Sequence, residues 1–220
     1  MRKNILLKIL VLYPLGIGLI LFLPAGSLQY WEAWLYVVVL LIPMLITVNY
    51  LAIHDPALLE RRMRFNEKEE KQKLIVKLFR LPFLLGFLIP GFDYRFSWSE
   101  VPVLLVIVAN LMVFAGYFLV FLVFRENSFT SRIVEVEKDQ KVISTGPYAI
   151  ICHPMYTGTI LMFLFTPLAL GSWWAFPVFA FLPVILIFRI LDEERVLRDN
   201  LPGYTEYCQK VRYRLIPKIW

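Results

Sequence analysis

The sequence of 220 residues is poor in charged side chains, which make up 18% of it, while 59% of its residues are hydrophobic. Because this small number of charged residues cannot cover the surface of a soluble domain, the composition excludes an ordinary soluble globular protein. The hydrophobic residues fall into runs of roughly 15 to 24, the length that crosses a bilayer as helix. The chain is therefore predicted to be an integral membrane protein in contact with membrane lipids.

The alternating pattern of a transmembrane β-barrel is missing, and open strands do not survive in lipid because each unpaired backbone group costs several kcal/mol. The fold class is therefore predicted to be all-α. Cysteine is scarce as well, with only Cys152 and Cys208 present. Both fall in segments predicted to face the cytoplasm, where thiols stay reduced, so a structural disulfide is not expected.

Several catalytic and nucleotide-binding motifs are also missing. There is no GxxxxGK[ST] phosphate loop, no GxSxG nucleophile elbow and no Cys and His group with the spacing of a metal site. Gly16 and Gly18 lie inside an apolar run without a preceding strand or a third glycine, so they form no dinucleotide fingerprint. The net charge of +6 does not indicate nucleic acid, because the basic residues lie beside the apolar runs, where membrane topology explains them.

About six apolar runs are predicted to span the membrane as a polytopic helical bundle. They cover residues 5–23, 30–53, 74–89, 101–124, 156–170 and 173–190. The third is the least regular, because Lys77, Arg80 and two prolines interrupt or border it, which leaves a tilted or partly re-entrant path open. The short gap at Gly171-Ser172 predicts that the last two runs form a tight helical hairpin.

Lysine and arginine are concentrated on one side of the predicted membrane. The opposite connections carry only Arg95. The positive-inside rule then places both termini in the cytoplasm. Without repeats or linkers, residues 1–220 are predicted to form a single membrane domain, with spanning helices in 1–124, a catalytic half in 125–220 and an amphipathic tail folding over the cytoplasmic surface.

The first polar motif lies just before the fifth predicted span. Gly146-Pro147 is a turn signal, and Pro154 suits the first turn of the following helix. His153 and Tyr156 would place an imidazole and a phenol on one helix face at the membrane interface. Tyr and His at such a place can also be simple interfacial anchors, so the motif alone leaves both interpretations open.

The second motif is an acidic pair, Glu193 and Glu194, where the last predicted span leaves the membrane. Neighbouring residues on a helix point about 100° apart. One glutamate can therefore pair with Arg189 or Arg198 while the other faces a pocket between the spans. A solvated salt-bridge face is the alternative interpretation.

A larger set of residues carries a family resemblance: Gly146-Pro147-Tyr148, His153-Pro154-Met155-Tyr156, Gly158, Glu193-Glu194, Gly203-Tyr204, Tyr207 and Arg214-Leu215-Ile216-Pro217. In order and spacing they resemble the isoprenylcysteine carboxyl methyltransferases and the related phospholipid N-methyltransferases. The resemblance runs from about Arg125 to the C-terminus. Those families usually have arginine before His-Pro, where this chain has Cys152, so the role of that arginine is not carried over.

The resemblance implies S-adenosylmethionine as cofactor, bound without a Rossmann domain. It implies that the cofactor pocket is formed by Tyr148, His153, Pro154, Tyr156, Glu193, Glu194, Tyr207 and Arg214, with Asn127 and Ser128 as weaker candidates. The catalytic candidates are His153, Glu193 and Glu194. They would act as base only for an amine or phenol, because a carboxylate or thiolate has no proton to lose. The predicted architecture favours a lipophilic acceptor that enters from the bilayer on the cytoplasmic side.

Two other functions remain open. Membrane sterol reductases that use NADPH have a similar C-terminal half, although an acidic pair suits a cationic sulfonium cofactor better than the phosphates of NADPH. A non-enzymatic scaffold or transporter would show polar clusters at mid-membrane. Only Asn49, Lys77, Arg80 and Asn110 come close to that pattern. The methyltransferase is therefore the primary hypothesis.

Overall fold

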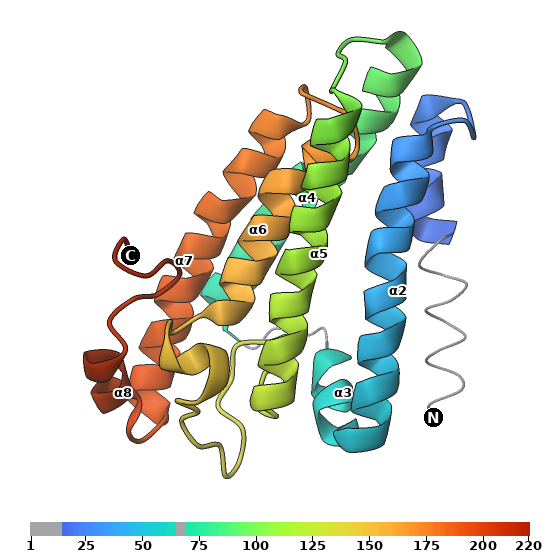
Figure 1. The fold of residues 1–220 in the computed structure, drawn as a ribbon. Helices are drawn as coiled ribbons and strands as arrows, with labels where there is room; N and C mark the ends of the chain where they lie inside the picture. Colours follow the sequence, from blue (N-terminus) through green and yellow to red (C-terminus); the bar gives the residue numbers. More distant parts are fainter. Residues whose placement is uncertain (1–14, 65–68) are drawn as a thin grey trace.

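The computed structural model describes residues 15–64 and 69–220, and every regular element in those two ranges is a helix. A helical segment, Leu15–Ala25, comes first. It is followed by α2 (Trp31–His54), α3 (Pro56–Arg62), α4 (Glu70–Phe96), α5 (Val103–Glu126), the short 3-10 helix η1 (Gly146–Ala149), α6 (Pro154–Ala169), α7 (Phe176–Asn200) and α8 (Tyr204–Lys210). The all-α fold class is thereby confirmed. The long helices form a bundle in which α6 lies between α5 and α7 (Figure 1).

Three of the described helices, α2, α4 and α5, are long and apolar enough to span a membrane. Helix α6 is apolar but has only 16 residues, and the last part of α7 is charged. The first predicted span begins outside the described residues. The membrane character of the chain is therefore confirmed, while the count of six spans stays a prediction.

The third predicted span differs from the expectation. Helix α4 is one continuous helix of 27 residues that runs through Pro82 and Pro90, so the partly re-entrant path is wrong. Helix α4 packs closely on α7: the Phe87 and Phe179 rings meet edge to face at 5.2 Å between centroids, and Gly86 leaves room for the Phe179 ring. Prolines are commonly tolerated inside membrane helices that pack against neighbouring helices.

One end of the bundle gathers the basic segments, and we refer to α3, residues 127–153 and α8 together as the basic end (Figure 1). The Asp55 side chain accepts a hydrogen bond from the Leu58 backbone N–H at 2.9 Å, as expected for the cap of α3. Arg61 donates to the Ser128 carbonyl at 2.9 Å, which binds α3 to the segment after α5. These contacts build a compact polar cap over one end of the helices.

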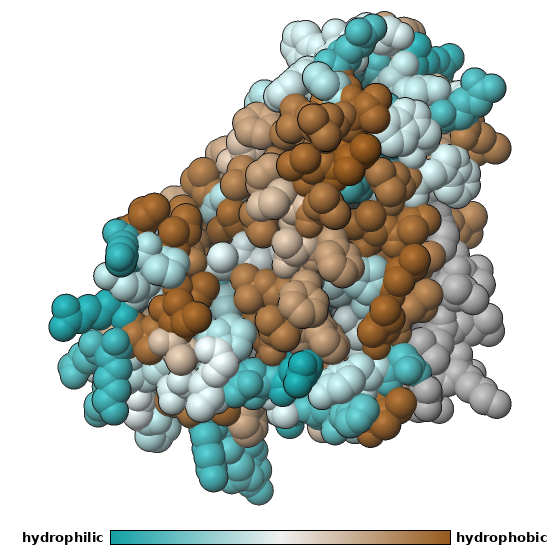
Figure 2. All heavy atoms as spheres, in the orientation of Figure 1, coloured by the Kyte–Doolittle hydropathy of each residue, from teal (hydrophilic) through white to brown (hydrophobic). Residues whose placement is uncertain are grey.

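The opposite end is closed by a buried carboxylate. Asp93, only 1% exposed, accepts hydrogen bonds from the Ser99 backbone N–H at 2.9 Å and from the Ser172 hydroxyl at 2.5 Å. It thereby joins the end of α4 to the connection between α6 and α7. Between the two polar ends, apolar side chains cover the middle of the molecule (Figure 2), as a helical bundle in lipid requires.

The predicted sidedness can be tested by labelling single cysteines from either side of the membrane, in a variant without Cys208. A cysteine at Lys138, on the basic end, is expected to react only with reagent that reaches the cytoplasm. A cysteine at Arg95, near the opposite end, is expected to react only from outside. The reverse pattern would show that the basic end faces outward.

Candidate active site

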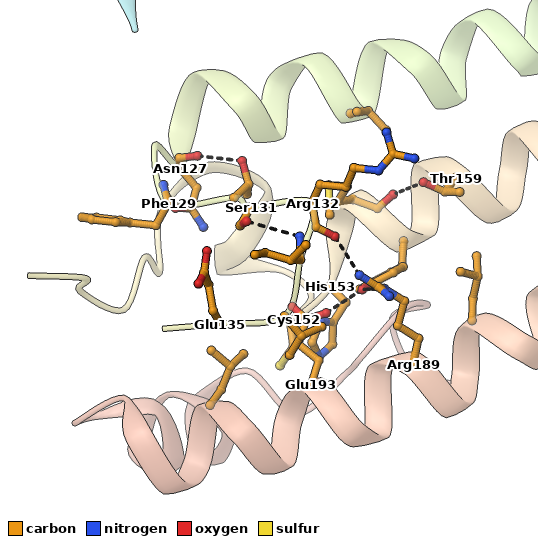
Figure 3. Close-up of a pocket in the computed structure, with 18 of the residues that line it drawn as sticks. Asn127, Phe129, Ser131, Arg132, Glu135, Cys152, His153, Thr159, Arg189 and Glu193 are labelled. Carbon is orange, nitrogen blue, oxygen red and sulfur yellow. Dashed lines mark hydrogen bonds between the residues drawn. The ribbon is translucent and has the colours of Figure 1, made fainter. Parts of the chain in front are cut away.

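A cavity of about 700 Å³ lies at the basic end, between α4, α6, α7 and residues 127–143. Apolar side chains from the long helices line its inner part: Phe79, Phe83, Val120, Met162, Phe163 and Leu186. Polar side chains line the part nearer the basic end: Arg62, Asn127, Arg132, Tyr148, His153, Arg189 and Glu193. Figure 3 shows that the labelled polar side chains come from the end of α5, from the segment after it, from the start of α6 and from α7. One cavity thus joins a polar and an apolar compartment.

Glu193 lies where the two compartments meet. Its Oε2 accepts a hydrogen bond from the Tyr156 hydroxyl at 2.5 Å, and Arg189 Nε donates to the same phenol oxygen at 3.1 Å. Tyr156 packs against Leu186, which lines the apolar compartment. The Glu193 carboxylate therefore stays beside the cavity and is oriented by α6.

Glu194, the next residue, is 2% exposed and does not line the cavity. Its carboxylate accepts hydrogen bonds from His153 Nε2 at 3.2 Å, from Arg214 Nε at 2.8 Å and from Arg198 Nη2 at 2.8 Å. Burial alone would raise the pKa of Glu194, but the hydrogen bonds and charges of His153 and Arg214 outweigh it and lower the pKa to about 2. Glu194 therefore stays ionised and fixes the imidazole of His153.

The C-terminal tail is bound directly to the first motif. The backbone N–H groups of Cys152 and His153 donate to the carbonyls of Tyr213 and Arg214 at 2.8 and 2.9 Å. The Cys152 thiol donates to the Val211 carbonyl at 3.0 Å, so it holds the tail at the position where the related families usually have arginine. His153 is the residue immediately before α6, and the centroid of its ring lies 5.8 Å from that of Tyr156.

Two tyrosines close the polar compartment. Asn127 Nδ2 donates to the Tyr148 hydroxyl at 3.1 Å, and the Tyr207 hydroxyl donates to the Tyr148 carbonyl at 2.8 Å. Tyr204, which is 5% exposed, adds a third aromatic wall from α8. The compartment therefore offers aromatic surface and fixed polar groups side by side.

The structure thus divides the predicted site residues into two groups. The residues that line the cavity are Tyr148, His153, Tyr156, Glu193, Tyr207 and the weaker candidate Asn127. The others, Pro154, Glu194, Arg214 and Ser128, are absent from its lining. Glu194 and Arg214 instead form the ion pair behind His153, and Pro154 begins α6. Their predicted direct contact with a cofactor stays a prediction.

Sequence reasoning missed Arg62, Arg132 and Tyr204 as lining residues. It had assigned the two arginines to membrane topology, and nothing local indicates that α3 meets the segment after α5. Tyr204 appeared only within the family pattern. Among the described residues, no group of three His, Cys, Asp or Glu side chains could hold a metal ion.

Comparison with known proteins shows similarity to a curated relative and to a family model. The mouse Delta(14)-sterol reductase TM7SF2 is 29% identical over 84 residues, which are 37% of this chain, and the chain spans about a fifth of that relative's length. The model of the phospholipid methyltransferase family matches residues 104–201, a stretch that includes α6 and the acidic pair on α7. The resemblance to the membrane methyltransferases is thereby confirmed over residues 104–201, the stretch that the model of the phospholipid methyltransferase family matches.

Proposed function

We propose that this protein transfers a methyl group from S-adenosylmethionine to a lipophilic acceptor at the cytoplasmic surface of the membrane. The observation that carries the proposal is the cavity in which a polar compartment beside Glu193 continues into an apolar one between the long helices. A water-soluble cofactor and a lipid-like acceptor can meet at such a junction. The family match over residues 104–201 supports the same reaction type.

The residues of the polar compartment fit the proposed cofactor. S-adenosylmethionine carries positive charge on its sulfonium and ammonium groups, and Glu193 offers a carboxylate at the cavity wall. Tyr148, Tyr204 and Tyr207 offer aromatic surface for its adenine ring. The volume of about 700 Å³ lies within the usual range for sites that bind small molecules and cofactors.

Once bound, the cofactor would supply an electrophilic methyl group, and the chain would align the acceptor and exclude water. His153, fixed by Glu194, and Glu193 are the proposed catalytic groups. They would be needed as base for an amine acceptor, whereas a carboxylate or thiolate would need only alignment. The ion pair of Glu194 and Arg214 would keep the tail closed over His153.

Binding of S-adenosylhomocysteine, the demethylated cofactor, tests the proposal. It is expected to raise the melting temperature of the detergent-purified chain, because a ligand that binds only the folded state stabilises it by RT ln(1 + [L]/Kd), about 2.7 kcal/mol at a hundredfold excess over Kd. NADPH at the same concentration is expected to leave the melting temperature unchanged. Isothermal calorimetry with both ligands provides the independent measurement.

An NADPH-dependent reductase is the second candidate, favoured by the similarity to the mouse sterol reductase and by the arginines that line the cavity. Arginine binds phosphate groups well. Glu193 at the cavity wall would oppose a phosphate. If the protein binds NADPH and does not bind S-adenosylhomocysteine, the methyltransferase proposal is wrong and the reductase takes its place.

A further inference from the structure

Within residues 15–64 and 69–220, the hydrogen bonds of Arg62, the last residue of α3, go only to neutral groups. Its Nη1 donates to the Ser131 carbonyl at 3.0 Å and approaches the Met155 sulfur at 3.8 Å. Its guanidinium also lies over the Phe124 ring, 5.1 Å from the ring centroid. Two nearby arginines instead pair with a carboxylate. Arg61 Nε lies 3.6 Å from Glu137 Oε1, and Arg64 Nη1 lies 2.5 Å from the same oxygen.

The position of Arg62 is unfavourable for a cation. Burial, together with the positive charges of Arg132 and Arg189, lowers the pKa of Arg62 to about 10, although Tyr156 acts in the opposite direction. All three arginines line the same cavity, and Arg189 Nη2 donates to the Arg132 carbonyl at 2.8 Å. Holding a partly buried guanidinium near two others costs free energy, which an anion in the cavity would recover.

The surroundings of Arg62 indicate what the anion is attached to. The cavity beside it continues into the compartment lined by Phe79, Phe163, Met162 and Leu186, which admits an apolar chain. Glu193, which we assign to the cationic cofactor, lines the same cavity from a different helix, α7. Anionic and cationic ligand groups thus have separate partners within one site.

We propose that Arg62 anchors a subsite for the anionic group, carboxylate or phosphate, of the lipophilic methyl acceptor. This inference rests on the proposed function, because it names the substrate class of the same site. Arginine binds both groups through paired N–H donors, so the shared chemistry is an oxyanion at the end of an apolar chain. Arg132 and Arg189 add positive charge around it.

The test measures equilibrium binding of three sixteen-carbon probes to the full-length chain in detergent: hexadecanoate, hexadecyl phosphate and hexadecan-1-ol. The parent is expected to bind at least one anionic probe about 10- to 150-fold more tightly than the alcohol, the factor that one charge-assisted hydrogen bond supplies. Whichever anionic probe binds more tightly identifies carboxylate or phosphate as the preferred group. Equal binding of all three probes by the parent would overturn the proposal.

Arg62→Gln is expected to abolish most of this preference while leaving binding of the alcohol unchanged. Arg61→Gln is the matched control, because Arg61 lies on the same short helix and is absent from the cavity lining. Arg62→Lys keeps a cation and is expected to retain part of the preference. If Arg61→Gln loses the preference for anionic probes as fully as Arg62→Gln does, the preference comes from general surface charge and the proposal is overturned.

S-adenosylhomocysteine separates this inference from the proposed function. If Arg62→Gln still binds it as the parent does, the variant is folded and the probe results stand. If the parent binds it without preferring anionic probes, the subsite is wrong and the proposed function survives. If the parent binds NADPH but not S-adenosylhomocysteine, and Arg62→Gln no longer binds NADPH, the arginine holds a nucleotide phosphate and both proposals fail.

Discussion

Replacing Gly116 or Gly158 by alanine is expected to destabilise the bundle and to disturb the candidate active site together. The two glycines face each other where α5 and α6 cross. A Cβ atom at Gly116 would lie 2.6 Å from the Gly158 carbonyl oxygen, and a Cβ at Gly158 would lie 2.6 Å from the Gly116 carbonyl oxygen. Both clashes are with backbone, so the helices must move apart rather than rotate a side chain. Such close crossings through small residues are a main source of helix association in membranes.

Overpacking of this kind costs about 1 to 3 kcal/mol, which corresponds to a melting temperature lower by roughly 2 to 12 °C for a chain of this size. Because Gly158 lies on α6 only two residues after Tyr156 and five after His153, the shift of α6 is also expected to weaken S-adenosylhomocysteine binding. Gly16→Ala is the control, since a Cβ at Gly16 would come within 4 Å of no packing neighbour in the part of the chain that the structure describes. Unchanged melting temperatures for both Gly116→Ala and Gly158→Ala would show that α5 and α6 do not cross this closely.

The positions of the long helices follow from hydropathy, but their ends do not. The predicted span at 173–190 corresponds to α7, which begins at Phe176 and continues to Asn200. Hydropathy detects only the part of a helix that suits lipid, whereas backbone hydrogen bonding continues beyond the lipid boundary. That continuation matters for the site, because it places Glu193 and Glu194 on a rigid helix.

The candidate site could be predicted only as far as local spacing reaches. The angle of about 100° between neighbouring helix positions predicts that Glu193 and Glu194 face different surroundings. It does not tell which one faces the cavity, since that depends on where Arg214 of the tail packs. Arg62 was beyond reach altogether, because its contact with Ser131 joins residues 69 positions apart.

The glutamate pair gives the largest expected functional effect, and the two substitutions are expected to act differently. Glu193→Gln removes the carboxylate at the cavity wall and is expected to weaken S-adenosylhomocysteine binding by about 10- to 150-fold, the loss of one charge-assisted hydrogen bond. Its effect on the free energy of unfolding is expected to stay below about 1 kcal/mol, because the amide can still accept from Tyr156.

Glu194→Gln is expected to reduce the free energy of unfolding by about 3 to 5 kcal/mol, the usual cost of removing one partner from a buried ion pair. The substitution leaves Arg214 and His153 without their carboxylate. Arg198→Gln tests the exposed side of this cluster, where the guanidinium side chain is 45% exposed and the expected loss is below about 1 kcal/mol. Glu206→Gln, at an exposed position on α8, is the charge-matched control for both glutamates.

The measurements are cofactor affinity by calorimetry and unfolding in denaturant for all four variants. If Glu194→Gln, tested under conditions where it is folded, loses the affinity and Glu193→Gln keeps it, the roles of the two glutamates are reversed. If both bind as the parent does, the cofactor does not lie beside this pair. The cavity would then need another carboxylate for the cationic ligand, and Glu135, which also lines it, would be the next residue to replace.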